Sequence, residues 1–219
     1  MKKGLIRFVI LSIVGFMLGA AFAYFEVRPK QQDAASRVME IKPVEAVKPI
    51  SDMKGEFSLI SEDGEAVTHA NWDGKYKLVF FGFTHCPDIC PAAMDKASEV
   101  LEMIGTDRSQ ILVPIFVTVD PARDTAEVMK EYTDGFDERI VGLTGSQDQI
   151  DAAIDTFKVY AAKAGMDEDN PHDQNDMYMM EHSSYFYLMN PNNELIKVVP
   201  SSDTVTEIAD KLSSLIQPK

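Results

Sequence analysis

Cysteine, histidine and basic residues are all scarce in this 219-residue chain. It contains two cysteines and four histidines, and 21 Lys and Arg stand against 35 Asp and Glu, for a formal net charge of −14. Because nucleic-acid binding depends on Lys and Arg contacts to phosphate, this shortage argues against a nucleic-acid partner. The chain also has no internal repeat, which excludes a repeat architecture. Its hydrophobic fraction of 45% and charged fraction of 26% are typical of a globular protein.

The longest apolar run lies near the N-terminus. Residues 8–25 carry no charge and follow Lys2, Lys3 and Arg7. This length is about the minimum for a spanning helix, and positive charge ahead of it favours a cytoplasmic N-terminus. A removed signal peptide, cleaved near Ala21-Phe22-Ala23, is the alternative.

We therefore expect a single-pass anchor in the inner (cytoplasmic) membrane, with the rest of the chain in the periplasm or an equivalent exported space. The expected parts are an anchor over residues 1–25, a polar and proline-containing linker over 26–50, and a globular domain over 51–219.

The globular part alternates short apolar runs with amphipathic segments. Strands are expected at 57–61, 66–68, 78–83, 111–119, 140–143, 183–189 and 195–199, and helices at 92–104, from 124, at 146–160 and at 206–215. This order predicts an α/β fold with a central mixed sheet flanked by helices. The polar residues 165–181 interrupt the pattern and are expected to form an exposed excursion.

The two cysteines, Cys86 and Cys90, follow the apolar run 78–83, and each precedes a proline. Pro91 favours the first turn of a helix, whose N-terminus lowers thiol pKa, so we expect reactive thiolates. As an i, i+4 helical pair their Cβ atoms would lie about 5–6 Å apart. That separation suits two sulfurs on one metal ion and is slightly wide for a disulfide, in which Cβ atoms are about 3.8 Å apart. A structural disulfide or two inert buried thiols remain the alternatives.

Among the histidines, His182 begins a strand from which it could reach the cysteine loop. His69 and His172 are expected to be exposed, and His85 to shape the loop rather than to bind. If Cys86, Cys90 and His182 converge, two thiolates and one imidazole suit Cu(I) and tolerate Cu(II), and zinc accepts the same ligands. The cysteine pair alone also fits thiol–disulfide exchange.

A methionine cluster precedes His182. Met177, Met179 and Met180 could bind soft Cu(I), but their spacing favours packing on the inner face of a strand.

Four segments, in order, resemble the Sco/SenC family of copper chaperones. They are Phe-Gly-Phe-Thr-His-Cys-Pro-Asp-Ile-Cys-Pro at 81–91, Thr-Val-Asp-Pro-Ala-Arg-Asp-Thr at 118–125, Ile-Val-Gly-Leu-Thr-Gly at 140–145 and Glu-His-Ser-Ser-Tyr-Phe-Tyr-Leu-Met at 181–189. One departure is Glu181, where Asp is more usual in the family.

The resemblance implies a thioredoxin-like fold that holds copper, as Cu(I) or Cu(II), through Cys86, Cys90 and His182. It further implies assembly of the CuA site of cytochrome c oxidase subunit II, by copper delivery or by reduction of that site's cysteines. Other copper chaperones or thioredoxin-like reductants are the further partners expected. Asp120 and Asp124 match acidic positions that serve partner docking, or are plain turn or cap residues.

The primary interpretation is thus a metallochaperone rather than an enzyme. The alternatives are a thiol–disulfide oxidoreductase that cycles Cys86 and Cys90, and a copper or redox sensor.

Overall fold

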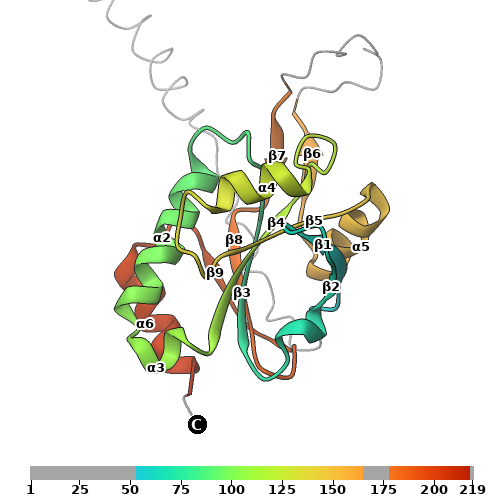
Figure 1. Ribbon diagram of the computed structural model, residues 1–219. Coiled ribbons are helices and arrows are strands. Elements are labelled where there is room, and N and C mark those ends of the chain that lie inside the picture. Colours follow the sequence, from blue (N-terminus) through green and yellow to red (C-terminus); the bar gives the residue numbers. More distant parts are fainter. Residues whose placement is uncertain (1–52, 165–177, 218–219) are drawn as a thin grey trace, which may run out of the picture. The chain divides into compact units, whose positions relative to one another are not determined.

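A seven-stranded mixed sheet is the centre of the computed structural model, which describes residues 53–164 and 178–217 (Figure 1). The strand order is β2–β1–β5–β4–β3–β8–β9. The bounds are β1 Ser58–Ser61, β2 Ala66–Thr68, β3 Tyr76–Gly82, β4 Leu112–Thr118, β5 Val141–Thr144, β8 Tyr185–Met189 and β9 Leu195–Pro200. β3, β4 and β5 run parallel, whereas β1, β2, β8 and β9 are joined to their neighbours by antiparallel pairing. The predicted mixed sheet is confirmed.

Helices cover both faces of this sheet. They are η1 His69–Trp72, α2 Ile89–Met103, α3 Thr106–Ser109, α4 Ala126–Thr133, α5 Gln147–Phe157 and α6 Val205–Leu215. Helices α2, α3 and α6 gather on one side of the sheet and α5 lies on the other (Figure 1). Each of α4, α5 and α6 is capped by a hydroxyl side chain that accepts a hydrogen bond from a backbone amide of the first turn. The capping residues are Thr125, Ser146 and Thr204, and they explain why these helices begin where the sequence indicated.

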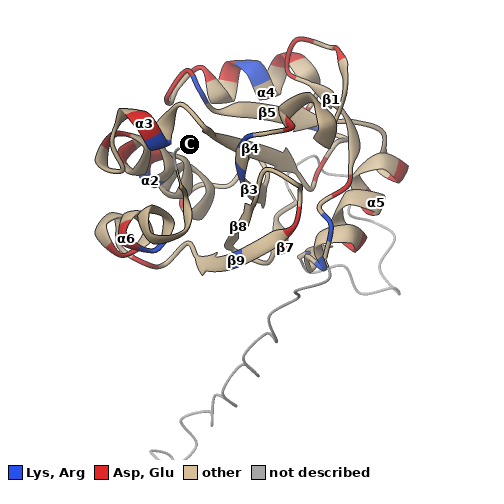
Figure 2. Cartoon of the chain, turned by 90° about the horizontal axis from the view of Figure 1, so that it is seen from below, with Lys and Arg blue, Asp and Glu red and all other residues tan. Residues whose placement is uncertain are grey.

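Acidic side chains are distributed over several of these helices. Figure 2 shows Asp and Glu on the helices around the sheet, with fewer Lys and Arg scattered among them. Within residues 53–164 and 178–217, the acidic residues are therefore not confined to a single cluster.

Strand β3 is buried along its whole length. Leu78, Val79, Phe80 and Phe81 are almost inaccessible to solvent, as predicted for a central strand. The strand begins two residues earlier than expected, at Tyr76. It therefore includes Lys77, whose side chain is also fully buried. The Lys77 ammonium donates a hydrogen bond of 3.4 Å to the carbonyl of Trp72, and burial lowers its pKa.

Two short strands that no local sequence pattern indicated form a separate ribbon. Strand β6 (Ala161–Lys163) pairs antiparallel with β7 (Met180–His182), so that Ala161 lies opposite His182. Most of the predicted excursion, with His172 and Met177, lies in residues 165–177, outside the described residues. The predicted anchor 1–25 and linker 26–50 also lie outside them. Along the described ranges, no helix combines the length and the hydropathy needed to cross a membrane.

The loop between β4 and α4 is held by a buried carboxylate, that of Asp124. It accepts hydrogen bonds from the Thr84 amide (3.1 Å), the Thr84 hydroxyl (2.6 Å) and the Thr118 hydroxyl (2.6 Å). Its backbone carbonyl accepts a further bond of 2.6 Å from the Thr144 hydroxyl. Asp124 thereby joins the ends of β3, β4 and β5. Since its side chain is fully buried and that of Asp120 nearly so, neither carboxylate is exposed for the partner docking considered above.

Replacing this carboxylate should destabilise the protein. Asp124→Ala removes the acceptor of three hydrogen bonds, and each buried donor left unsatisfied costs about 1–3 kcal/mol. Because the substitution also removes a buried charge, we expect a net loss of about 2–4 kcal/mol in the free energy of unfolding. Urea denaturation of the full chain measures it. Asp124→Asn, which keeps one carbonyl oxygen, should lose less.

The matched control is Asp210→Ala on the exposed surface of α6, which should change the free energy of unfolding by no more than about 0.5 kcal/mol. Equal effects of Asp124→Ala and Asp210→Ala would contradict the structural role assigned to Asp124.

Candidate metal site

The cysteine segment forms a loop and the first turn of a helix beyond the C-terminal end of β3. Cys90 is the second residue of α2, whereas Cys86 lies in the loop before the helix. The helix begins at Ile89, so the prediction of an i, i+4 helical pair is wrong. The Cys90 amide instead donates a hydrogen bond to Cys86 Sγ at 3.4 Å. Both thiols are free; Cys86 is half-buried and Cys90 is fully buried.

The last residue of β3, Gly82, makes room for Cys90. A Cβ atom at Gly82 would lie 2.7 Å from Cys90 Sγ and 2.7 Å from Cε2 of Phe116. Contacts this short are not tolerated between packed atoms, so glycine is required by the approach of the thiol. The Cys90 sulfur is thus seated directly against the central strands.

Burial determines the protonation of Cys90. Removal from water raises the pKa of this thiol well above its ordinary value, and a backbone hydrogen bond at Phe83 only partly opposes the effect. The neighbouring Cys86 raises it further. The expectation of a reactive thiolate is therefore wrong for Cys90, because loss of solvation exceeds the effect of the helix N-terminus.

His182 brings its imidazole to the buried thiol from β7. The distance from His182 Nε2 to Cys90 Sγ is 3.5 Å, although 92 residues separate them in sequence. His182 Nδ1 lies 3.1 Å from the carbonyl oxygen of Ser183. A carbonyl only accepts hydrogen bonds, so this contact assigns the proton to Nδ1 and leaves the Nε2 lone pair facing the sulfur.

Two aromatic rings orient this imidazole. Phe80 and Phe83 meet the His182 ring edge to face, with centroids 6.1 Å and 5.9 Å away. Burial also lowers the pKa of His182, which favours the neutral form that a metal requires. Neither phenylalanine was assigned to the site from the sequence: Phe80 was marked only by membership of an apolar strand, and Phe83 only by its place in the segment 81–91.

The candidate ligands adjoin a cleft of about 360 Å³. Cys86 and His182 line it together with Phe83, Pro87, Asp88, Ile89, Met179, Met180, Glu181 and Ser184. Over residues 53–164 and 178–217, no three His, Cys, Asp or Glu side chains are gathered closely enough to form a ready-made metal cage. Cys90 thus contacts Cys86 and His182, and those two line the same cleft, but the three side chains do not form a closed ligand shell. This donor set fits a soft metal ion.

The other two histidines that the structure describes, His85 and His69, make different contacts. His85, with 52% of its side chain exposed, has Nδ1 3.1 Å from the Thr84 hydroxyl and 3.7 Å from the Asp124 carboxylate. It shapes the loop, as predicted. His69 is half-buried and meets the Phe57 ring edge to face at 6.2 Å, so the expectation of an exposed side chain is wrong.

The described methionines divide between packing and exposure. Met180 is partly buried against the core, as predicted. Met179 is 43% exposed, so the packing prediction is wrong there. Both line the cleft beside Cys86 and His182.

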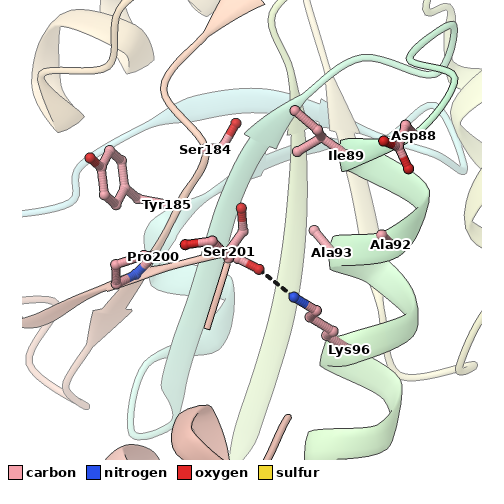
Figure 3. A pocket seen from close by; sticks show the side chains of 10 residues that line it. Asp88, Ile89, Ala92, Ala93, Lys96, Ser184, Tyr185, Pro200 and Ser201 are labelled. Atoms are coloured by element: carbon pink, nitrogen blue, oxygen red, sulfur yellow. Dashed lines mark hydrogen bonds between the residues drawn. The ribbon is translucent and has the colours of Figure 1, made fainter. Parts of the chain in front are cut away.

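A second cavity, of about 420 Å³, adjoins the cleft and shares Asp88, Ile89 and Ser184 with it (Figure 3). It lies between the first turns of α2 and the strands β8 and β9. At its far side the Lys96 ammonium donates to the Ser201 carbonyl at 2.6 Å. No thiol or imidazole lines this cavity, so it is a neighbouring groove rather than a metal site. Ile89, 49% exposed, stands where the two spaces meet.

Comparison with known proteins agrees with this arrangement. A family model described as SCO1/SenC matches residues 46–217. A SCO2-like protein of Rickettsia felis is 35% identical over 197 residues, which cover 90% of each chain. The crystal structure of Arabidopsis thaliana ScoI with copper bound is 35% identical with a TM-score of 0.65, covering 74% of this chain and 96% of that one.

The likeness extends in fold to BsSco, described as a member of the Sco family of cytochrome c oxidase assembly proteins. It has a TM-score of 0.56 and 22% identity, and the match covers 78% of this chain and 98% of that one. The thioredoxin-like Sco fold expected from the sequence is confirmed. Because the family model spans most of its length and a relative shares more than a third of its residues over nine tenths of it, this chain belongs to the SCO1/SenC family.

Proposed function

We propose that this protein is a membrane-anchored copper chaperone that binds one copper ion through Cys86, Cys90 and His182. We further propose that it assists assembly of the CuA site in subunit II of cytochrome c oxidase. The observation that carries the proposal is the 3.5 Å approach of His182 Nε2 to Cys90 Sγ, with Nδ1 at the Ser183 carbonyl and the Nε2 lone pair directed at that sulfur.

The chemistry of the donors supports copper. Sulfur ligands select soft Cu(I), and an imidazole allows Cu(II) as well. Copper is bound in the related Arabidopsis ScoI. Zinc accepts the same donors, and its affinity for them is tested by competition with copper.

The exposure of the donors supports transfer rather than storage. Cys86 and His182 line an open cleft, so a thiol of an acceptor protein has a route to bound copper. Cys90, buried beneath them against Gly82, would be the last of the three to release the ion. Copper would then pass to the acceptor by stepwise exchange of ligands, which makes the protein a metallochaperone rather than an enzyme.

The proposed oxidase partner and the proposed membrane location are supported by the sequence and by similarity to related proteins. BsSco is described as belonging to a family of oxidase assembly proteins, and CuA assembly is what the motif resemblance implies. The apolar run at 8–25, with positive charge before it, supports an anchor in the inner membrane and a domain in the periplasm. Such an anchor would keep the domain close to a membrane-embedded oxidase.

The second candidate is a thiol–disulfide oxidoreductase that acts on cysteines of the oxidase copper site. Both thiols are free, and the accessible Cys86 could attack a partner disulfide before Cys90 resolves the mixed disulfide. BsSco has an identified disulfide switch, which favours this candidate. The raised pKa of Cys90 disfavours it, because a buried thiol supplies little thiolate at neutral pH.

Loss of His182 separates the two functions. The reduced full chain in detergent should bind one copper, and His182→Ala should lower copper affinity at least about a hundredfold because a direct ligand is removed. Competition with a copper chelator measures the affinity. The matched control is His85→Ala, which removes an imidazole one residue from Cys86 but should leave the affinity within about twofold of wild type.

Copper affinity that is indifferent to His182, together with disulfide exchange at Cys86 and Cys90 that proceeds normally in His182→Ala, would reject the chaperone site. That pair of results would favour the oxidoreductase.

Copper binding should release protons. The raised pKa of Cys90 means that its thiol is protonated at neutral pH, whereas a bound sulfur is a thiolate. His182, with its lowered pKa, is already neutral above pH 7 and releases none. Copper affinity should therefore increase at least about tenfold per pH unit between pH 7 and 8.5. Chelator competition across this range checks it, and an affinity that does not change with pH would show that Cys90 does not bind as a thiolate.

Delivery should depend on the apolar rim of the cleft. Ile89 is 49% exposed beside the candidate ligands, and Met103 is 53% exposed at the opposite end of the same helix. Ile89→Ser should slow copper transfer to an apo CuA domain several-fold with copper affinity unchanged, because it removes apolar contact area near the transferred ion. Met103→Ser is the matched control and should leave transfer unaffected. Equal transfer rates for the two variants would argue against docking at this rim.

A further inference from the structure

The ribbon that carries His182 has little support of its own. Strands β6 and β7 have three residues each and form a two-stranded sheet apart from the main one. Isolated two-stranded ribbons are marginally stable at best. Something outside the ribbon must therefore keep His182 within 3.5 Å of Cys90.

Tyr178, four residues before His182, connects the ribbon to the body of the domain. Its hydroxyl donates a hydrogen bond to the Asp120 carboxylate, and its carbonyl accepts one of 2.9 Å from Arg123 Nη1. The Arg123 guanidinium lies over the Tyr178 ring at 3.7 Å from its centroid, and the Lys163 ammonium of β6 lies over it at 4.1 Å. The hydroxyl, the ring and the backbone carbonyl of Tyr178 thus each contact another residue.

The partners of Tyr178 are themselves fixed. Asp120 and Arg123 form an ion pair in the loop after β4, and both are largely buried. Arg123 also lies 5.9 Å from the centroid of Phe83, the ring that meets His182 edge to face. The same loop ends at Asp124, which binds Thr84 beside the cysteine segment. One loop therefore contacts both halves of the candidate metal site.

We propose that Asp120, Arg123 and Tyr178 are positioning residues that hold His182 against Cys90 and thereby set copper affinity. This inference rests on the proposed function, in which His182 is a copper ligand. The hydroxyl of Tyr178 gives the most specific mutational test, since Tyr178→Phe removes its hydrogen bond to Asp120 and keeps the ring. Burial and the bond to Asp120 raise the pKa of Tyr178 to about 12, so the phenol remains a donor throughout the physiological range.

The first test measures the ribbon without metal. The amides of Ala164 and Ser183 donate hydrogen bonds to Met179 and Tyr160 across the ribbon, so their hydrogen exchange reports its opening. Tyr178→Phe and Arg123→Lys should each accelerate this exchange about tenfold in the copper-free full chain. The control is Tyr160→Phe, which removes an exposed hydroxyl at the start of the ribbon and should have no effect.

The second test is a double-mutant cycle on copper affinity. Tyr178→Phe should lower the affinity about tenfold when His182 is present and should have no effect in the His182→Ala background. Equal losses in both backgrounds would overturn the proposal, since the cluster would then act on the fold or on the cysteines. No loss in either, with His182→Ala itself weakening copper, would also overturn it.

The two tests also separate this inference from the function on which it rests. If His182→Ala leaves copper affinity unchanged, the copper site fails, and hydrogen exchange alone then decides whether the cluster holds the ribbon. Unchanged exchange in Tyr178→Phe would reject that role as well.

Discussion

The buried carboxylate of Asp124 is the interaction on which the geometry of the candidate site depends. A charge removed from water is costly unless hydrogen bonds replace its solvation, and here three donors do so. Because those donors lie just after β3, at Thr84, and at the end of β4, at Thr118, satisfying the charge also fixes the loops that follow these strands. The site then occupies the crevice beyond the carboxyl ends of parallel strands, where α/β sheets commonly place their ligands.

At Cys90 two physical effects oppose each other, and burial prevails. Charge effects at a helix N-terminus are worth about 0.3–1 kcal/mol, up to about 2 kcal/mol in partly buried geometries. Full desolvation shifts a pKa by as much as 3–5 units, at about 1.4 kcal/mol per unit. The thiol therefore keeps its proton until a cation replaces it. A buried thiol that gives up its proton to a metal ion suits a carrier better than a reductant in which that thiol must resolve a mixed disulfide at neutral pH.

The sequence predicted the central sheet and most helix starts because those features have local signals, such as the apolar run of β3 and the capping residues Thr125 and Ser146. The thiol protonation was mispredicted because burial of Cys90 depends on Gly82 and Phe116, which lie on different strands. The β6–β7 ribbon was missed because three-residue strands carry no periodicity. The contact between Cys90 and His182 spans 92 residues; the position of His182 at a strand made it possible, and the family resemblance implied it. Nothing local marks Tyr178 as a partner of Arg123.

The candidate ligands differ in how firmly the fold holds them, and this difference bears on copper release. Cys90 is fixed against the central strands and Cys86 lies in a loop tied to Asp124 through Thr84, whereas His182 is on a ribbon outside the main sheet. If all three ligands were held rigidly, copper would bind tightly and dissociate slowly, since no single ligand could move away before the others. If copper is held as proposed, the ligand on the separately held ribbon, His182, would be the one that an acceptor thiol could replace first, with Cys86 and Cys90 as the remaining ligands. On that proposal the contacts at Tyr178 would set the balance between retention and delivery, because they would determine how much free energy is needed to move His182 away.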